Sequence, residues 1–153
     1  MTDFESIREA AVAYIGIDFN KSSGSVRRNL LKKGAPESLV EDVIRYLKEI
    51  DYIDDRRAAK RVASRYQGKR QRSRRAMIDV FCRNGIEYEV AKCAASVLDA
   101  DEDTALELLA ASFSTTADAS EINAMRKLLY RRGYGENTVR RAIAAFFDPS
   151  FID

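Results

Sequence analysis

A helical pattern that ends in glycine occurs three times in this chain, and it constrains the fold more than any other feature. In each copy, apolar residues lie eight and four positions before the glycine, which places both on one face of a helix. The copies are Val26 and Leu30 before Gly34, Met77 and Phe81 before Gly85, and Met125 and Leu129 before Gly133. The glycines are 51 and 48 residues apart, a spacing that indicates internal repeats.

The pattern continues after each glycine. Small or apolar residues follow at offsets of six, nine, ten and thirteen, the spacing of a buried helical stripe. They are Val40, Val43, Ile44 and Leu47 in the first copy, Ala91, Ala94, Ala95 and Leu98 in the second, and Val139, Ala142, Ile143 and Phe146 in the third. A further helix is predicted ahead of each copy, over 4–14, 55–67 and 103–113, with loops at 19–25 and 114–120.

The chain is therefore predicted to be all-α, with three tandem three-helix repeats that resemble helix-turn-helix units. We place the repeats at 1–51, 52–100 and 101–148, followed by a tail at 149–153. A lone three-helix unit buries little apolar surface, whereas stacked copies share a core and form an elongated, curved body.

The three glycines have a structural interpretation. Each follows the last residue of a periodic stretch, with Lys or Arg in the final turn. A residue in the left-handed conformation commonly ends a helix at this position, and glycine adopts that conformation without steric cost. We therefore interpret these glycines as helix ends and do not assign them to a ligand-binding loop.

Composition argues against catalysis. The chain has no histidine, which excludes Ser-His-Asp and Cys-His nucleophile pairs. It contains neither a phosphate-binding loop nor a dinucleotide-binding glycine pattern. Cys82 and Cys93 lie in apolar helical patterns, so we expect buried, reduced thiols and no zinc site. No catalytic residue, cofactor or metal is expected.

No apolar run reaches the roughly 18 residues of a membrane span. The first residues include Asp3 and Glu5, where a signal peptide would carry basic residues. The protein is therefore expected in the cytoplasm, without membrane contact.

Positive charge is concentrated in one stretch, although the formal net charge is only +2. Residues 56–75 carry ten basic side chains and no acidic one. On a helical wheel, Arg56, Arg57, Lys60, Arg61 and Arg65 occupy one half, opposite Ala58, Ala59, Val62, Ala63 and Tyr66. A concentrated cationic stripe repels itself unless it faces an anion. The phosphate backbone of a nucleic acid is the partner that this stripe favours.

The order of several short motifs resembles the RecX family of RecA regulators over about residues 20–147. The residues that carry the resemblance are Tyr52-Ile53-Asp54-Asp55 followed by Arg57-Ala58-Ala59, then Ser64-Arg65-Tyr66-Gln67-Gly68, Arg83-Asn84-Gly85-Ile86 and Leu129-Tyr130-Arg131-Arg132-Gly133-Tyr134. Two positions depart from the family pattern. Ala58 stands where an aromatic residue is usual, and Lys69-Arg70-Gln71-Arg72-Ser73 replaces a Gly-Pro.

The resemblance implies a regulator that acts without catalysis in DNA repair, recombination and the SOS response. Such proteins are expected to bind in the groove of the RecA–single-stranded-DNA filament and to lower its ATPase activity, strand exchange and stability. A monomer is expected. The predicted RecA or DNA contacts are Arg57, Lys60, Arg61, Arg65, Lys69, Arg70, Arg72, Arg74 and Arg75. Arg131 and Arg132 are a candidate second contact.

Two other classes of function remain open at this point. The repeats could form a non-specific DNA-binding helix-turn-helix module without RecA specificity, although Glu37, Glu87 and Glu136 begin the helices that would read the groove. A scaffold repeat protein could instead present its basic face to an acidic protein. An enzyme is the interpretation that the sequence supports least.

Overall fold

The computed structural model describes residues 2–152, without the side chains of residues 151–152, and over this range every element of regular secondary structure is a helix. The α-helices are α1 (Phe4–Ile15), α2 (Ser23–Lys32), α3 (Glu37–Glu49), α4 (Asp55–Ala63), α5 (Arg74–Arg83), α6 (Tyr88–Ser96), α7 (Asp101–Ser112), α8 (Ile122–Arg131) and α9 (Glu136–Phe147). Short 3₁₀ segments are η1 (Gly68–Arg70), η2 (Ala119–Glu121) and η3 (Pro149–Ile152). The all-α prediction is confirmed.

The helices recur in the order that the three glycines predict. The helices before them, α2, α5 and α8, have ten residues each. Gly34, Gly85 and Gly133 all have positive φ, at 89°, 83° and 93°. The next helix begins three residues after each glycine. The interpretation of these glycines as left-handed helix ends is confirmed.

The chain divides into two compact units, Met1–Val62 with Val80–Ala94, and Ala63–Asp79 with Ala95–Asp153. We call them unit 1 and unit 2. Their boundary crosses α5 and α6, inside the second of the expected repeats. The repeat boundaries and the elongated, curved body therefore stay predictions.

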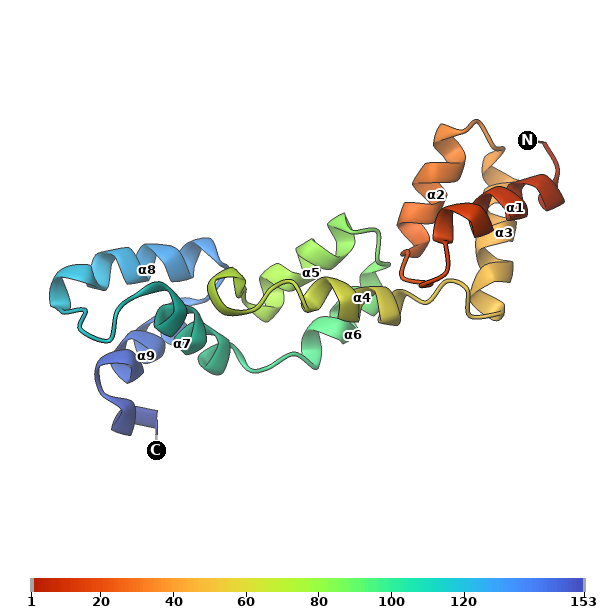
Figure 1. The fold of residues 1–153 in the computed structure, drawn as a ribbon. Coiled ribbons are helices and arrows are strands. Elements are labelled where there is room, and N and C mark those ends of the chain that lie inside the picture. The colour runs from red at the N-terminus through yellow and green to blue at the C-terminus, as the bar shows by residue number, and fades with distance from the viewer. Residues whose placement is uncertain (1, 153) are drawn as a thin grey trace. The chain divides into compact units, whose positions relative to one another are not determined.

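In unit 1, the helices α1, α2 and α3 pack against one another (Figure 1). Their apolar faces form a core in which Ile7, Val26, Leu30 and Leu47 are fully buried. Side chains cap two of the helices, because Asp3 accepts from the Ser6 amide and Ser22 accepts from the Ser25 amide. Such caps satisfy amides that have no partner within the helix.

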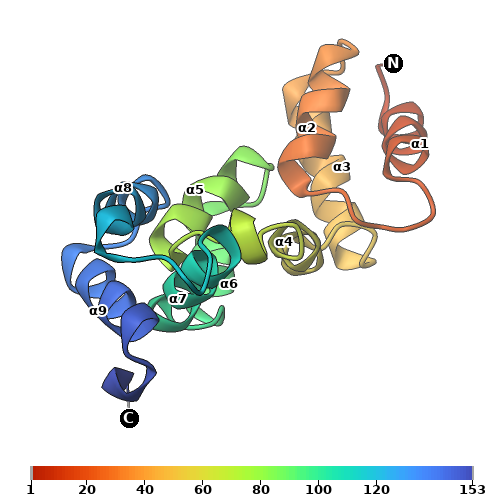
Figure 2. The same cartoon turned by 60° about the vertical axis from the view of Figure 1, so that its left-hand side comes forward.

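In unit 2, α9 packs against α7 and α8 (Figure 2). Leu108, Met125 and Leu129 are fully buried in its core. Tyr134 is also buried there, and its hydroxyl lies 2.8 Å from Thr104 Oγ1. Burial raises the pKa of Tyr134 to about 12. The apolar stripes predicted for the first and third copies therefore do form cores.

Glycine has a second role at two of the helix ends, where another segment packs closely against it. A Cβ on Gly85 would overlap Ser22 Oγ and lie 2.8 Å from the Ser25 amide nitrogen. A Cβ on Gly133 would lie 2.6 Å from Ser73 Oγ. Nothing lies within 4 Å of the same position at Gly34. The sequence pattern predicted the helix ends but not these contacts.

Several local predictions are wrong. The helix expected over 55–67 ends at Ala63, and α2 begins at Ser23, inside the loop expected at 19–25. Cys82 and Cys93 are exposed and not buried. The core positions of α5 are Met77, Val80 and Phe81, and Cys82, one step further around the helix, points away from them.

Candidate nucleic-acid interface

The helix α4 carries the part of the basic stretch that lies in unit 1. Ala58, Ala59 and Val62 are buried on one side, whereas Lys60 and Arg61 are exposed. The Asp54 carboxylate accepts from the Arg56 amide at 2.9 Å and so caps the helix. The amphipathic character predicted for this helix is confirmed up to Ala63.

Asp55, the second residue of the Asp-Asp pair, has a different role that the sequence did not reveal. Its side chain is buried and accepts from the Ser23 amide and the Ser23 hydroxyl, both at 2.7 Å. It also accepts from the Glu87 amide at 3.0 Å. One carboxylate therefore satisfies donors at the start of α2 and just before α6. This arrangement fixes the position at which α4 begins.

Arg57 is held inside unit 1. Its Nε donates to Phe19 O at 2.7 Å, and its Nη2 donates to Asp51 O at 3.0 Å. The side chain is half-buried. Of the predicted contact residues on α4, Lys60 and Arg61 thus present their side chains to solvent, and Arg57 braces two loops.

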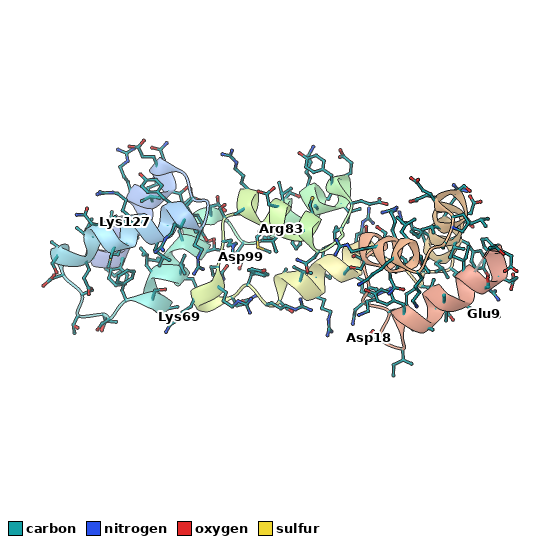
Figure 3. All side chains as sticks on the ribbon, turned by 90° about the horizontal axis from the view of Figure 1, so that it is seen from above. Glu9, Asp18, Lys69, Arg83, Asp99 and Lys127 are labelled. Carbon is teal, nitrogen blue, oxygen red and sulfur yellow. The ribbon has the colours of Figure 1, made fainter. Side chains whose placement is uncertain are left out.

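In unit 2, the basic stretch continues through the irregular residues 64–73 around η1 and into the first two residues of α5. Arg65, Lys69, Arg70 and Arg75 are exposed, and Lys69 extends away from η1 (Figure 3). Arg70 and Arg72 lie over the ring of Tyr66, with guanidinium carbons 5.1 and 4.9 Å from its centroid. The ring face attracts these cations. Tyr66 therefore belongs to the basic cluster and not to the apolar face on which the helical wheel placed it.

Two further arginines anchor this segment. Arg74 donates from Nε to Leu98 O at 2.9 Å, and its amide donates to Asp101 Oδ1 at 2.9 Å. Arg132 Nη1 donates to Lys69 O at 2.7 Å and to Gln71 O at 3.2 Å. Burial lowers the pKa of Arg132, and the neighbouring positive charges of Arg72 and Arg131 lower it further. Arg132 therefore holds η1 in place, whereas Arg131 is exposed.

The predicted contact residues thus fall into two classes. Arg57, Arg74 and Arg132 donate to backbone carbonyls, and Arg72 stacks on Tyr66. The exposed cations are Lys60 and Arg61 in unit 1, and Arg65, Lys69, Arg70, Arg75 and Arg131 in unit 2. Exposed Lys and Arg can neutralise phosphate groups and release counterions. The arrangement suits binding of a polyanion.

Within residues 2–152, no three His, Cys, Asp or Glu side chains lie where they could hold a metal ion. The same residues include no helix with the length and apolarity needed to cross a bilayer. A cavity of about 70 Å³ beside Tyr66, Gln67 and Thr104 has room for only a few water molecules.

Comparisons with known proteins agree on one family. The chain is 30% identical over 124 residues to the regulatory protein RecX of Treponema pallidum, a match that covers 80% of this chain and 67% of that protein. It is 32% identical over 120 residues to the regulatory protein RecX of Streptomyces coelicolor, covering 74% of this chain and 63% of the relative. No family model matches the chain.

The fold has a counterpart among solved structures. The crystal structure of RecX from Lactobacillus salivarius superimposes with a TM-score of 0.75 and covers 94% of this chain and 96% of that one. The sequence identity is 17%, so this likeness concerns the fold alone.

Proposed function

This chain belongs to the RecX family of regulatory proteins, and from that membership we propose that it regulates a RecA recombinase. In the proposed mechanism, it binds in the groove of the RecA–single-stranded-DNA filament. Its binding lowers ATPase activity and strand exchange and favours filament disassembly. The protein acts as a cytoplasmic monomer and catalyses no reaction itself.

The basic stretch is the single observation that carries the proposal. Residues 56–75 contain no acidic side chain, and most of their cations are exposed. A filament that contains DNA presents phosphate groups at regular intervals, and exposed cations gain counterion-release free energy from them. The same cations suit acidic side chains on a recombinase surface.

The inward-facing arginines support the same proposal in another way. Arg74 ties the start of α5 to the loop after α6, and Arg132 holds η1. Arg57 ties α4 to the loops at Phe19 and Asp51. A contact surface that is ordered before binding loses less conformational entropy when it binds. We therefore assign these three arginines to positioning, and the exposed cations to contact.

The test is a RecA ATPase assay on single-stranded DNA with the purified protein. Wild-type protein should inhibit the reaction. The variant Lys60→Glu/Arg65→Glu/Lys69→Glu/Arg75→Glu should lose inhibition, because all four side chains are exposed and their reversal repels phosphate.

A matched control carries the same charge change elsewhere. Arg28, Lys32, Lys33 and Arg45 are also exposed, and the variant with glutamate at all four positions should retain most of the inhibition. Far-UV circular dichroism should show wild-type helical content for both variants. Undiminished inhibition by the first variant, or equal losses in both, would refute the assignment of the basic stretch.

A further inference from the structure

The helices α1–α3 form the first three-helix set of the chain, and α7–α9 form the last. The last two helices of each set have the same length before, and the same spacing after, a glycine, so they can be compared residue by residue. The helices α2 and α8 each have ten residues and end two positions before a glycine. The helices α3 and α9 each begin three residues after it. Within each set, the two helices pack together. The fifth residues of α2 and α3 therefore correspond to the fifth residues of α8 and α9.

In the first set, these fifth residues form an ion pair. Arg27 donates through Nε and Nη2 to the two carboxylate oxygens of Glu41, the second bond measuring 3.1 Å. The hydrogen bond from Arg27 lowers the pKa of Glu41, and the same bond raises the pKa of Arg27. A bidentate guanidinium–carboxylate pair thus joins the solvent-facing sides of α2 and α3.

In the last set, both positions hold arginine. Arg126 and Arg140 occupy the places of Arg27 and Glu41. Both are exposed. Each donates to a neutral amide on its own helix, Arg126 to Asn123 at 3.5 Å and Arg140 to Asn137 at 2.6 Å. A second arginine therefore stands where the first set has a carboxylate, and like charges on two packed helices favour an external anion.

The neighbouring side chains indicate what kind of anion this is. Lys127, Tyr130 and Arg131 are exposed on the same helix, with Lys127 labelled in Figure 3. Several cations along one helix suit a chain of phosphates better than a single ion. An exposed tyrosine beside them offers a face on which a nucleobase can stack.

We propose that Arg126 and Arg140 bind a backbone phosphate of single-stranded DNA, at the position that the Glu41 carboxylate takes in the first set. The choice of single-stranded DNA rests on the proposed function. The site lies in unit 2 and lies outside the predicted basic stretch. Its phosphate oxygens accept from the two guanidinium groups as the Glu41 oxygens accept from Arg27.

The comparison suggests a substitution that fills the site from within. Arg140→Glu restores the arrangement of the first set, so its carboxylate should pair with Arg126 and displace the phosphate. Arg141→Glu is the matched control, because it changes the net charge equally at the next residue of α9. The residue of α3 that corresponds to Arg141 is Asp42, which pairs with Arg45 on the same helix.

Binding is measured by fluorescence anisotropy with a labelled oligo(dT) at about 50 and about 200 mM salt. Arg140→Glu should weaken binding about tenfold at the lower salt, and the slope of log affinity against log salt should fall by about 0.7, as for one lost phosphate contact. Arg141→Glu should weaken binding about twofold or less, as a non-specific charge change.

A second variant and a stability measurement guard against misfolding. Arg126→Gln should also weaken oligo(dT) binding, because it removes one of the two donors. The thermal midpoint of Arg140→Glu should be no lower than that of Arg141→Glu, since the new carboxylate has a partner. Equal affinity losses in Arg140→Glu and Arg141→Glu, or an unchanged affinity in Arg140→Glu, would overturn the proposal.

The RecA ATPase assay separates this proposal from the proposed function. If wild-type protein does not inhibit RecA but Arg140→Glu alone loses oligo(dT) affinity, the site stands and the proposed function fails. If wild-type protein inhibits RecA while both variants bind oligo(dT) equally, the function stands and the site is refuted. Loss of filament binding without loss of oligo(dT) binding would assign these arginines to an acidic protein surface and overturn the DNA assignment.

Discussion

Replacing Gly85 with alanine should destabilise the protein more than the same replacement at Gly34, although the two backbones are nearly alike. Their φ values are 83° and 89°, so alanine incurs a left-handed penalty of about 1–2 kcal/mol at either position. Gly34 has open space at the new Cβ. At Gly85, the Cβ would overlap Ser22 Oγ and lie 2.8 Å from the backbone nitrogen of Ser25. Because that neighbour is backbone, overpacking should add about 1–3 kcal/mol.

The difference between the two variants isolates the packing of Gly85 against the start of α2. Both glycines lie in unit 1, so their variants report on the same unit. Urea denaturation followed by circular dichroism at 222 nm would give the two free energies of unfolding. Equal losses for Gly85→Ala and Gly34→Ala would show that only backbone strain matters and would refute this reasoning.

Two further predictions concern buried polar groups. Asp55→Asn should lower the free energy of unfolding by about 1–3 kcal/mol, because an amide cannot accept from all three donors that now bond the carboxylate. Asp54→Asn is the control, since Asn caps a helix as well as Asp, and similar losses in urea denaturation of the two would contradict the role given to Asp55. Spectrophotometric titration should show a tyrosine that ionises near its pKa of about 12 and is absent in Tyr134→Phe. Burial favours the neutral phenol, so the pKa of Tyr134 is higher in the folded than in the unfolded protein. The free energy of unfolding that the neutral Tyr134 contributes is therefore complete below about pH 10 and is lost as the pH rises toward 12. Ionisation of every tyrosine together near pH 10 in the folded protein would contradict this.

Local sequence signals predicted the secondary structure well, since the physical cause of each lies within a few residues. The helix expected over 4–14 is found at Phe4–Ile15, because its apolar spacing and its Asp3 cap are both local. The three glycines mark helix ends for the same reason. The family was also recognisable from the sequence, through the order of short motifs along the chain.

The roles of individual charged side chains could not be predicted in this way. The helical wheel placed Arg57 and Lys60 on the same basic face, but Arg57 donates to a carbonyl 38 residues earlier in the chain. Arg132 similarly bonds carbonyls more than 60 residues away. Such partners depend on tertiary packing, and the five donors of a guanidinium group let Arg serve either a surface or an interior role.

Binding to the recombinase filament tests the central claim most directly. A labelled single-stranded oligonucleotide, free or coated with RecA, is titrated with wild-type protein under identical salt conditions. The proposed function predicts tighter binding to the filament than to the free oligonucleotide, and a loss of that preference in the Lys60→Glu/Arg65→Glu/Lys69→Glu/Arg75→Glu variant. Equal affinity for coated and free DNA would contradict it and would favour a DNA-binding module without RecA specificity.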